Sequence, residues 1–185
     1  MNNWYRFRLG GLNSHLILTL MKDFENFGDI NKKDLIELNY SKETIDSISS
    51  LLEIDLEDEK EKYKRNKVRI LSYNSDEYPR MLKEISNPPP FLYVKGNGKF
   101  SNKSLAVVGT RKISSYGKLA CDKIVSGFNN KGITIVSGLA LGVDTYAHEI
   151  ALKGNSSVIG VVAQGLDIIY PPSNARLYKE VEEKG

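Results

Sequence analysis

The sequence predicts an α/β protein in which a small all-helical module precedes part of a parallel sheet with flanking helices. Two patterns lead to this fold class. Residues 1–52 carry apolar side chains at helical spacing between turn signals. Residues 104–184 repeat one unit three times: a short β-branched run, a loop that contains glycine, and a helical stretch. Such alternation is typical of a parallel sheet covered by its connecting helices.

The N-terminal module is expected to span residues 1–66. Turn signals at Gly10-Gly11, Gly28-Asp29 and 39–41 divide it into short helices. Its apolar stripes comprise Leu16, Leu18, Leu20, Met21, Phe24 and Phe27, and then Ile45, Ile48, Leu51 and Leu52. The mixed charges of residues 55–69 indicate a solvated helix or a linker rather than a nucleic-acid-binding arm.

Residues 67–103 are predicted to connect the two modules. The run 68–72 favours a short strand. Three consecutive prolines at 88–90 cannot lie in a helix or a central strand, so they indicate an extended crossing.

The α/β domain is expected to span residues 104–185, with strands at 105–108, 133–136 and 157–163. Ser114 or Ser115 is a candidate cap for the first helix, which is predicted to end at 130–132. The second helix is expected to run from near Asp144 to Lys153-Gly154, and Ser173 or Asn174 is a candidate cap for the third. Three strands are few for such a sheet, so we expect the sequence to be cut within a domain.

Charge is unevenly distributed along the chain. Residues 1–100 carry 16 basic and 16 acidic side chains, whereas residues 101–143 carry six basic and one acidic. The surplus around the first glycine loop favours a polyanionic partner. The chain has one cysteine, Cys121, expected to be buried, and shows neither a signal peptide nor an apolar run long enough to span a bilayer. A cytoplasmic protein without membrane contact is therefore expected.

The loops that follow the three strands are the predicted site, because ligands of parallel sheets bind at the carboxyl ends of the strands. Glycine allows close backbone approach, hydroxyls and amides donate hydrogen bonds, and an arginine fork holds phosphate. The candidate phosphate-binding residues are Gly109, Thr110, Arg111, Lys112, Ser137 and Gly138. Secondary candidates are Gly142, Gln164, Gly165 and Tyr170.

Several better-known sites are excluded by spacing. Arg111 and Ser114 break the dinucleotide fingerprint, and Lys118 lacks the neighbours of a P-loop lysine. Asp144 and His148 stand four residues apart on one predicted helix, but two ligands do not make a metal site, and a capping aspartate with a packed histidine is expected instead. Neither a catalytic residue nor a cofactor or metal site is therefore predicted.

Three collinear motifs resemble the DprA/Smf family of DNA-processing proteins. They are Gly109-Thr-Arg111 with Tyr116-Gly117, Ser137-Gly138-Leu-Ala-Leu-Gly142-Val-Asp144 with Ala147-His148, and Gly165-Leu-Asp167 with Tyr170-Pro171 and Asn174. The connector, with Tyr78-Pro79 and the triple proline, is similar to the segment that leads into that family's Rossmann-like domain. The N-terminal module looks like a degenerate sterile-alpha-motif-like domain, so the resemblance covers nearly the whole chain.

This resemblance implies a non-enzymatic protein that binds incoming single-stranded DNA during natural transformation. Such proteins shield the strand and help to load the RecA recombinase, usually as homodimers when full length. The family's G-[ST]-R loop corresponds to Gly109, Thr110 and Arg111. The sequence departs from the family pattern at the 9–13 hairpin, which lacks the G-[IV]-G of a DNA-gripping module, so a structural or partner role is expected there. The resemblance also implies later strands, a further basic segment and a dimer surface that residues 1–185 do not include, in line with the expectation of a sequence cut within a domain.

Two alternatives remain open at this point. One is a Rossmann-like nucleotide-binding enzyme of the lysine-decarboxylase-like phosphoribohydrolase type, although its P-G-G-x-G-T-x-x-E motif is absent. The other is an interaction module in which the glycine loops are only structural. A preference for mononucleotides would favour the enzyme, and binding of neither mononucleotide nor oligonucleotide would favour the module.

Overall fold

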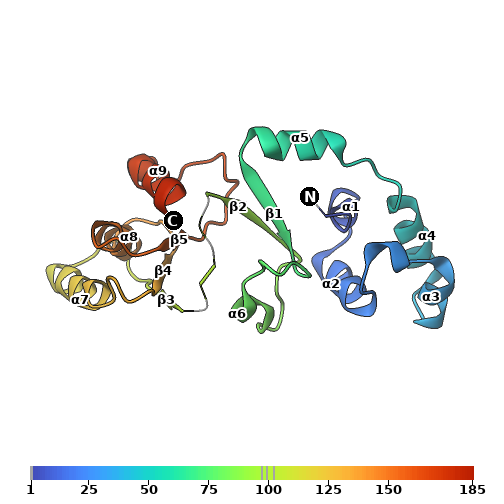
Figure 1. Ribbon diagram of the computed structural model, residues 1–185, viewed down its shortest axis with the longest axis horizontal. Helices are drawn as coiled ribbons and strands as arrows, with labels where there is room; N and C mark the ends of the chain where they lie inside the picture. The colour runs from blue at the N-terminus through green and yellow to red at the C-terminus, as the bar shows by residue number, and fades with distance from the viewer. Residues whose placement is uncertain (1, 97, 99, 102) are drawn as a thin grey trace. The chain divides into compact units, whose positions relative to one another are not determined.

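A computed structural model describes residues 2–96, 98, 100, 101 and 103–185 of the chain (Figure 1). The chain divides into two compact units, Met1–Val94 and Lys95–Gly185. The boundary between them falls inside the predicted connector. The expected division into three parts, at 66 and 103, stays a prediction.

The first unit begins with short helices separated by turns. They are α1 (Tyr5–Leu9), α2 (Ser14–Asp23), the 3-10 helix η1 (Phe27–Asp29), α3 (Lys32–Glu37), α4 (Lys42–Leu51) and α5 (Glu57–Arg65). The turn signals at 10–11 and 39–41 separate helices as predicted, whereas Gly28-Asp29 lies inside η1. Asn13 and Ser41 cap α2 and α4 by accepting a hydrogen bond from a backbone N–H of the first turn.

The predicted connector contributes a two-stranded sheet to this unit. Strand β1 (Val68–Ser72) pairs with β2 (Phe91–Lys95), and α6 (Arg80–Lys83) lies between them in sequence. The first strand was predicted, but the second was not. The prolines at 88–90 indicated an extended crossing, and the strand begins at the residue that follows them. Phe91 is buried in the same hydrophobic core as the helices. The extended segment is therefore part of a folded unit.

Three tyrosines join the helices to this sheet. The Tyr5 hydroxyl lies 3.0 Å from that of Tyr63 on α5 and 2.9 Å from that of Tyr93 on β2. Burial and these two neighbours raise the pKa of Tyr5 well above its ordinary value, so its phenol stays protonated. The Tyr5 ring meets the rings of Tyr63 and Tyr93 edge to face, and the Tyr63 and Tyr93 rings are tilted against each other. One hydroxyl thus connects α1 to two other elements.

Tyr5→Phe should lower the free energy of unfolding of the first unit by about 1–3 kcal/mol, because it removes two partly buried hydrogen bonds. Denaturant unfolding followed by fluorescence of Trp4, the one tryptophan in the sequence and a buried core residue, measures this change. Tyr73→Phe is the matched control, since the Tyr73 hydroxyl has no hydrogen-bond partner among the described residues. Equal effects of the two substitutions would contradict the prediction.

The second unit contains the predicted parallel sheet. Strands β3 (Ser104–Ala106), β4 (Thr134–Ser137) and β5 (Val158–Gly160) pair in parallel in the order β3-β4-β5. The helices are α7 (Ser115–Ser126), α8 (Val143–Lys153), the 3-10 helix η2 (Pro172–Asn174) and α9 (Ala175–Lys184). The predicted α/β fold class is confirmed. Strand β5 is shorter than the predicted 157–163 because its partner β4 ends at Ser137, opposite Gly160.

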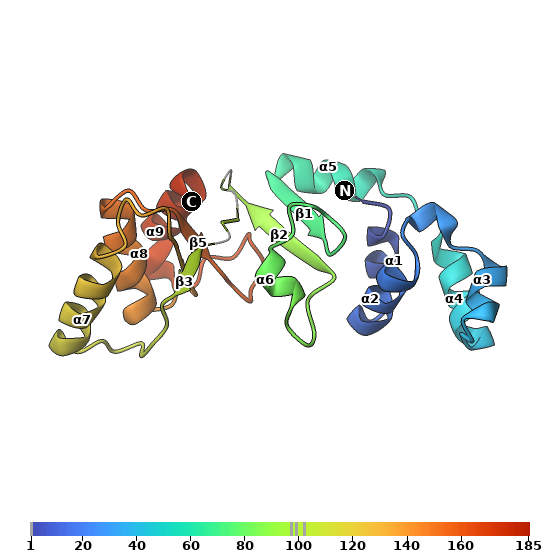
Figure 2. The same cartoon turned by 60° about the horizontal axis from the view of Figure 1, so that its bottom comes forward.

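The helices of this unit pack on one face of the sheet. Leu105, Ile135 and Val158 occupy one row across the three strands and belong to the core that the helices cover. Figures 1 and 2 show α7, α8 and α9 on the same side of β3, β4 and β5. Cys121 is buried in this core, as predicted. Since the helices of such units run back along the sheet, all three connecting loops after the strands open at one edge.

Among the described residues, no helix has the length and apolar character that crossing a membrane requires.

Candidate functional site

The first glycine loop leaves the sheet with its backbone donors unpaired. The Val107 N–H still donates to the Val136 carbonyl on β4, at 2.9 Å. Within the described part of the chain, the next four N–H groups, those of 108–111, have no acceptor. The Thr110 Oγ1 accepts the Lys112 N–H at 3.1 Å, which folds the loop back on itself. Arg111 is exposed, and its guanidinium has no ion-pair or hydrogen-bond partner in that same part of the chain.

Two predicted glycines bring the first and second loops into contact. The Val143 N–H, at the start of α8, donates to the Thr110 carbonyl at 3.1 Å. A Cβ on Gly109 would lie 2.7 Å from Val143 Cγ2, and a Cβ on Gly142 would lie 2.2 Å from the Thr110 carbonyl oxygen. The sequence predicts that these glycines allow an anion to approach the backbone closely. In the structure, they allow the backbones of the first and second loops to approach each other.

Ser137 and Gly138 have partners inside the protein. Ser137 is 3% exposed, and its hydroxyl donates to the Val107 carbonyl at 2.6 Å. The Gly138 N–H donates to the Asp144 carboxylate at 3.1 Å. Asp144 is therefore not the cap of its own helix that the sequence suggested, since it fixes the second loop instead. The phosphate-binding role of Ser137 and Gly138 stays a prediction, and their polar groups are already engaged.

Asn174 holds the second loop from the other side. Its Nδ2 donates to the Leu139 carbonyl at 2.9 Å and to the Thr145 Oγ1 at 2.8 Å. Leu139 has a φ of 55°, in the left-handed region that residues with bulky apolar side chains rarely adopt. The contacts of Asn174 help to maintain this conformation. Asn174 precedes α9, as expected for a cap, but its side chain makes no capping bond. The sequence signal for this clamp was only the Pro-Pro-Ser-Asn run.

The third loop is tied to α9. The Gln164 Nε2 donates to the Tyr178 hydroxyl at 2.7 Å, and that hydroxyl donates to the Tyr170 carbonyl at 2.9 Å. A Cβ on Gly165 would lie 2.5 Å from the Asp167 Oδ1. Of the secondary candidates in this loop, Tyr170 presents its side chain to solvent. Gln164 instead holds the loop to α9, and Gly165 leaves room for the Asp167 carboxylate.

His148 packs as the sequence analysis expected. It is fully buried on α8, with its Nε2 3.2 Å from the Ile159 carbonyl on β5. Burial lowers the pKa of His148 below its ordinary value, and the hydrogen bond to the Ile159 carbonyl and the nearby charge of Asp144 oppose this shift without cancelling it. No group of three or more His, Cys, Asp or Glu side chains suited to a metal ion occurs in the part of the chain that the structure describes.

Acidification should therefore destabilise the second unit. Because burial lowers the pKa of His148 in the fold, the unfolded chain gains a proton near its ordinary pKa of about 6.5, and the folded chain gains it only at a lower pH. Stability falls as the pH drops through this value, with a slope from this group of at most about 1.4 kcal/mol per pH unit. Hydrogen exchange of α8 measured from pH 7.5 to 5 tests this. His148→Gln should lose that part of the slope, and an unchanged slope in the variant would contradict the assignment.

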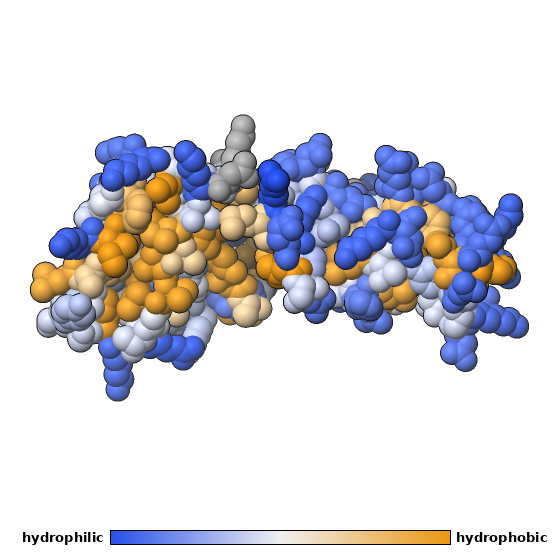
Figure 3. Space-filling model, turned by 90° about the horizontal axis from the view of Figure 1, so that it is seen from below, coloured by the Kyte–Doolittle hydropathy of each residue, from blue (hydrophilic) through white to orange (hydrophobic). Residues whose placement is uncertain are grey.

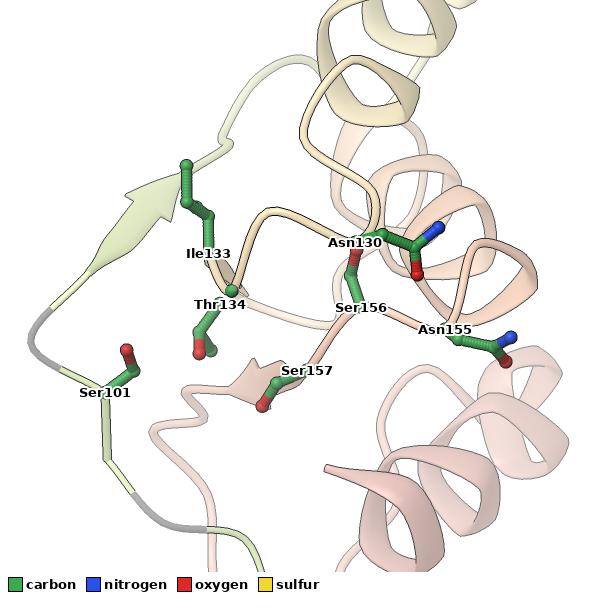
Figure 4. A pocket seen from close by; sticks show the side chains of 8 residues that line it. Ser101, Asn130, Ile133, Thr134, Asn155, Ser156 and Ser157 are labelled. Atoms are coloured by element: carbon green, nitrogen blue, oxygen red, sulfur yellow. The ribbon is translucent and has the colours of Figure 1, made fainter.

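A polar hollow lies at the opposite edge of the sheet, where β4 and β5 begin (Figure 4). Its volume is about 330 Å³, and hydroxyl and amide side chains line it, among them Ser101, Asn130, Thr134 and Ser157. None of the predicted site residues lines it, and none of its lining side chains is charged. The hollow is thus separate from the glycine loops and offers an anion no cation.

The first loop and the following helix α7 carry a net positive charge, with Asp122 near the end of the helix as their one acidic residue. Residues 104–121 contain Arg111, Lys112 and Lys118 and no acidic residue. The Lys118 side chain extends over the Tyr146 ring of α8, with its Nζ 5.9 Å from the ring centroid. Arg111 and Lys112 remain exposed beside unpaired backbone donors. Fold and site together define an α/β domain that presents a loop with exposed cations and unpaired backbone donors at the carboxyl edge of a parallel sheet.

Comparison with known proteins identifies the family. Residues 69–185, more than half of the chain, match the family described as DNA recombination-mediator protein A, and the chain belongs to this family. DNA processing protein DprA of Streptococcus pneumoniae is 33% identical over 175 residues, which cover 94% of this chain and 61% of that protein. Protein Smf of Synechocystis is 36% identical over 130 residues, 68% of this chain and 33% of its own length.

Solved structures agree with the fold. The structure of DNA processing protein A from Streptococcus pneumoniae covers the whole chain with a TM-score of 0.78 and 31% identity, and the chain covers 65% of it. A structure that addresses the unique single-stranded DNA binding mode of DNA processing protein A from Helicobacter pylori covers 64% of the chain, with a TM-score of 0.56 and 31% identity; the chain covers 53% of it. The chain spans between about a third and three fifths of the length of its curated relatives.

Proposed function

We propose that this chain binds single-stranded DNA at the carboxyl edge of β3 and β4, as part of a protein that processes DNA in natural transformation. One observation carries the proposal: the exposed, unpaired guanidinium of Arg111 stands beside four backbone N–H groups that lack acceptors. Such a set holds a phosphate by charge and by paired hydrogen bonds. Binding directed at the backbone of a strand requires little reading of its sequence.

The relatives support this assignment. DNA-processing proteins match most of the chain, and the Helicobacter pylori protein among the structural relatives has a single-stranded DNA binding mode. We further propose that the full-length protein shields the bound strand, passes it to the RecA recombinase and acts as a homodimer in the cytoplasm. These roles come from the family resemblance of the motifs in loops 109–112, 137–144 and 165–174.

We also propose that the protein is not an enzyme and uses neither a cofactor nor a metal. The polar groups at the carboxyl edge support this view, because they offer donors and a cation rather than a nucleophile with its base. Ser137 is buried and donates to a carbonyl, and His148 is fully enclosed. Neither side chain is positioned to reach a substrate in the loops.

The test is a fluorescence-anisotropy titration of a labelled oligothymidylate with this chain at two salt concentrations. Duplex DNA and a mononucleotide serve as competitors. We expect binding that weakens with salt and resists both competitors, because a single strand offers several phosphates in an adaptable backbone. Effective competition by the mononucleotide would instead favour the phosphoribohydrolase-like alternative. Absence of binding by a chain that circular dichroism shows to be folded would contradict the proposal for this part of the protein.

A further inference from the structure

Large apolar side chains are exposed on both sides of the first glycine loop. Val108, immediately before Gly109, is 75% exposed, and Tyr116, the second residue of α7, is 80% exposed. Leu119, one turn further along the helix, is also exposed. On the face drawn in Figure 3, hydrophobic residues form a broad area over the second unit. Exposed apolar surface of this kind marks a contact site.

Tyr116 lies on the part of α7 that does not pack against the core of this unit. The helix buries Cys121 and Val125 in the core. Tyr116 makes neither a ring contact nor a hydrogen bond through its side chain within the residues described. Its position close to the start of the helix is fixed by Ser114, whose side chain accepts the Gly117 N–H at 3.1 Å. An aromatic ring is thus held in solvent on a rigid element, five residues after Arg111.

The surroundings of this ring favour nucleic acid over an apolar protein surface. From β3 to the end of α7, residues 104–126 carry four cations and one acidic side chain, so the ring lies in a segment whose net positive charge attracts polyanions. Aromatic rings beside cations are the combination by which proteins bind unpaired nucleic-acid bases, since every base has a face that stacks. Duplex DNA keeps its bases inside the stack and offers this ring no partner.

We propose that Tyr116 stacks on an unpaired base of the strand whose phosphate Arg111 holds. This inference rests on the proposed function and specifies it: the site selects single strands because it binds both a phosphate and the face of a base. Tyr116 is a binding residue here, and the ring rather than the phenolic hydroxyl is the group that matters.

Two oligomers of equal length separate stacking from phosphate binding: oligothymidylate, and an abasic oligomer with the same phosphates. Tyr116→Ala should weaken binding of oligothymidylate by about tenfold. The same variant should leave affinity for the abasic oligomer unchanged, and Tyr116→Phe should behave like the unaltered chain. Because Tyr116 is so exposed, all variants should give the circular-dichroism spectrum of the unaltered chain.

Ile124→Ala is the matched control, since it removes another exposed apolar side chain from the same helix, about 12 Å further along. It should leave the affinity for both oligomers unchanged. If Tyr116→Ala weakens both oligomers equally, or neither, the stacking inference is overturned while phosphate binding at Arg111 stands. If the unaltered chain binds neither oligomer, the proposed function fails, and the inference fails with it.

Discussion

Gly142→Ala is expected to destabilise the second unit by at least about 3 kcal/mol, because two unfavourable effects coincide at this residue. Gly142 has a φ of 83° and a ψ of −122°, a conformation that residues with a Cβ avoid. The added Cβ would also lie 2.2 Å from the Thr110 carbonyl oxygen and 2.6 Å from the Arg111 carbonyl carbon. Both of these atoms are backbone, so the first loop would have to move. Denaturant unfolding by far-UV circular dichroism, with hydrogen exchange of 107–114, measures the effect.

Gly132→Ala separates the two causes. Gly132 also has a positive φ, of 66°, but a Cβ there would meet nothing within 4 Å. Only the backbone strain applies, so this substitution should cost about 1 kcal/mol. If both substitutions cost the same, the contact between the two loops would contribute nothing to stability. The assignment of Gly142 to loop packing would then be wrong.

Much of the second unit could be predicted because its signals are local. A short β-branched run predicts a strand, the glycine-containing segment after it predicts a loop, and the amphipathic stretch that follows predicts a helix. The cap at Ser114 was among the two predicted, and the ends of the strands came within a few residues. The length of β5 could not be predicted, because it depends on where the neighbouring strand ends.

The predicted connector shows what local signals miss. Three prolines correctly exclude a helix at 88–90, but they say nothing of Phe91, whose burial depends on packing against the helical module. The contact between Tyr5 and Tyr93 joins residues far apart in sequence. Propensity describes neighbours along the chain, and tertiary contacts of this kind override it.

The candidate site was predictable in place and less so in detail. Topology alone brings the three loops to one edge of the sheet. It does not specify which polar groups remain unpaired. Ser137 is predicted as a phosphate donor, a role that stays a prediction, but the sequence does not indicate that its hydroxyl donates to the Val107 carbonyl just beyond β3. Asn174, a candidate cap, became the clamp of another loop, because its amide is buried beside the Leu139 carbonyl.

Arg111→Ala should weaken binding of oligothymidylate by about 1–3 kcal/mol and reduce the salt dependence by about one charge. The guanidinium is an exposed cation at the loop with unpaired donors, and no carboxylate among the described residues forms an ion pair or a hydrogen bond with it. Anisotropy titrations at several salt concentrations give both quantities. Arg111→Lys should keep the salt dependence but lose part of the affinity, because an ammonium group lacks the planar fork.

Lys153→Ala is the control for charge alone. Lys153 ends α8, whose first residue bonds to Thr110, so it lies about 15 Å from the loop along the helix. That separation exceeds the Debye length of about 8–10 Å at physiological salt, so its charge is screened from a phosphate at Arg111. Affinity should therefore change little. Equal losses in the two alanine variants would mean that the strand responds to the net charge of the unit, and the first glycine loop would no longer be the binding site.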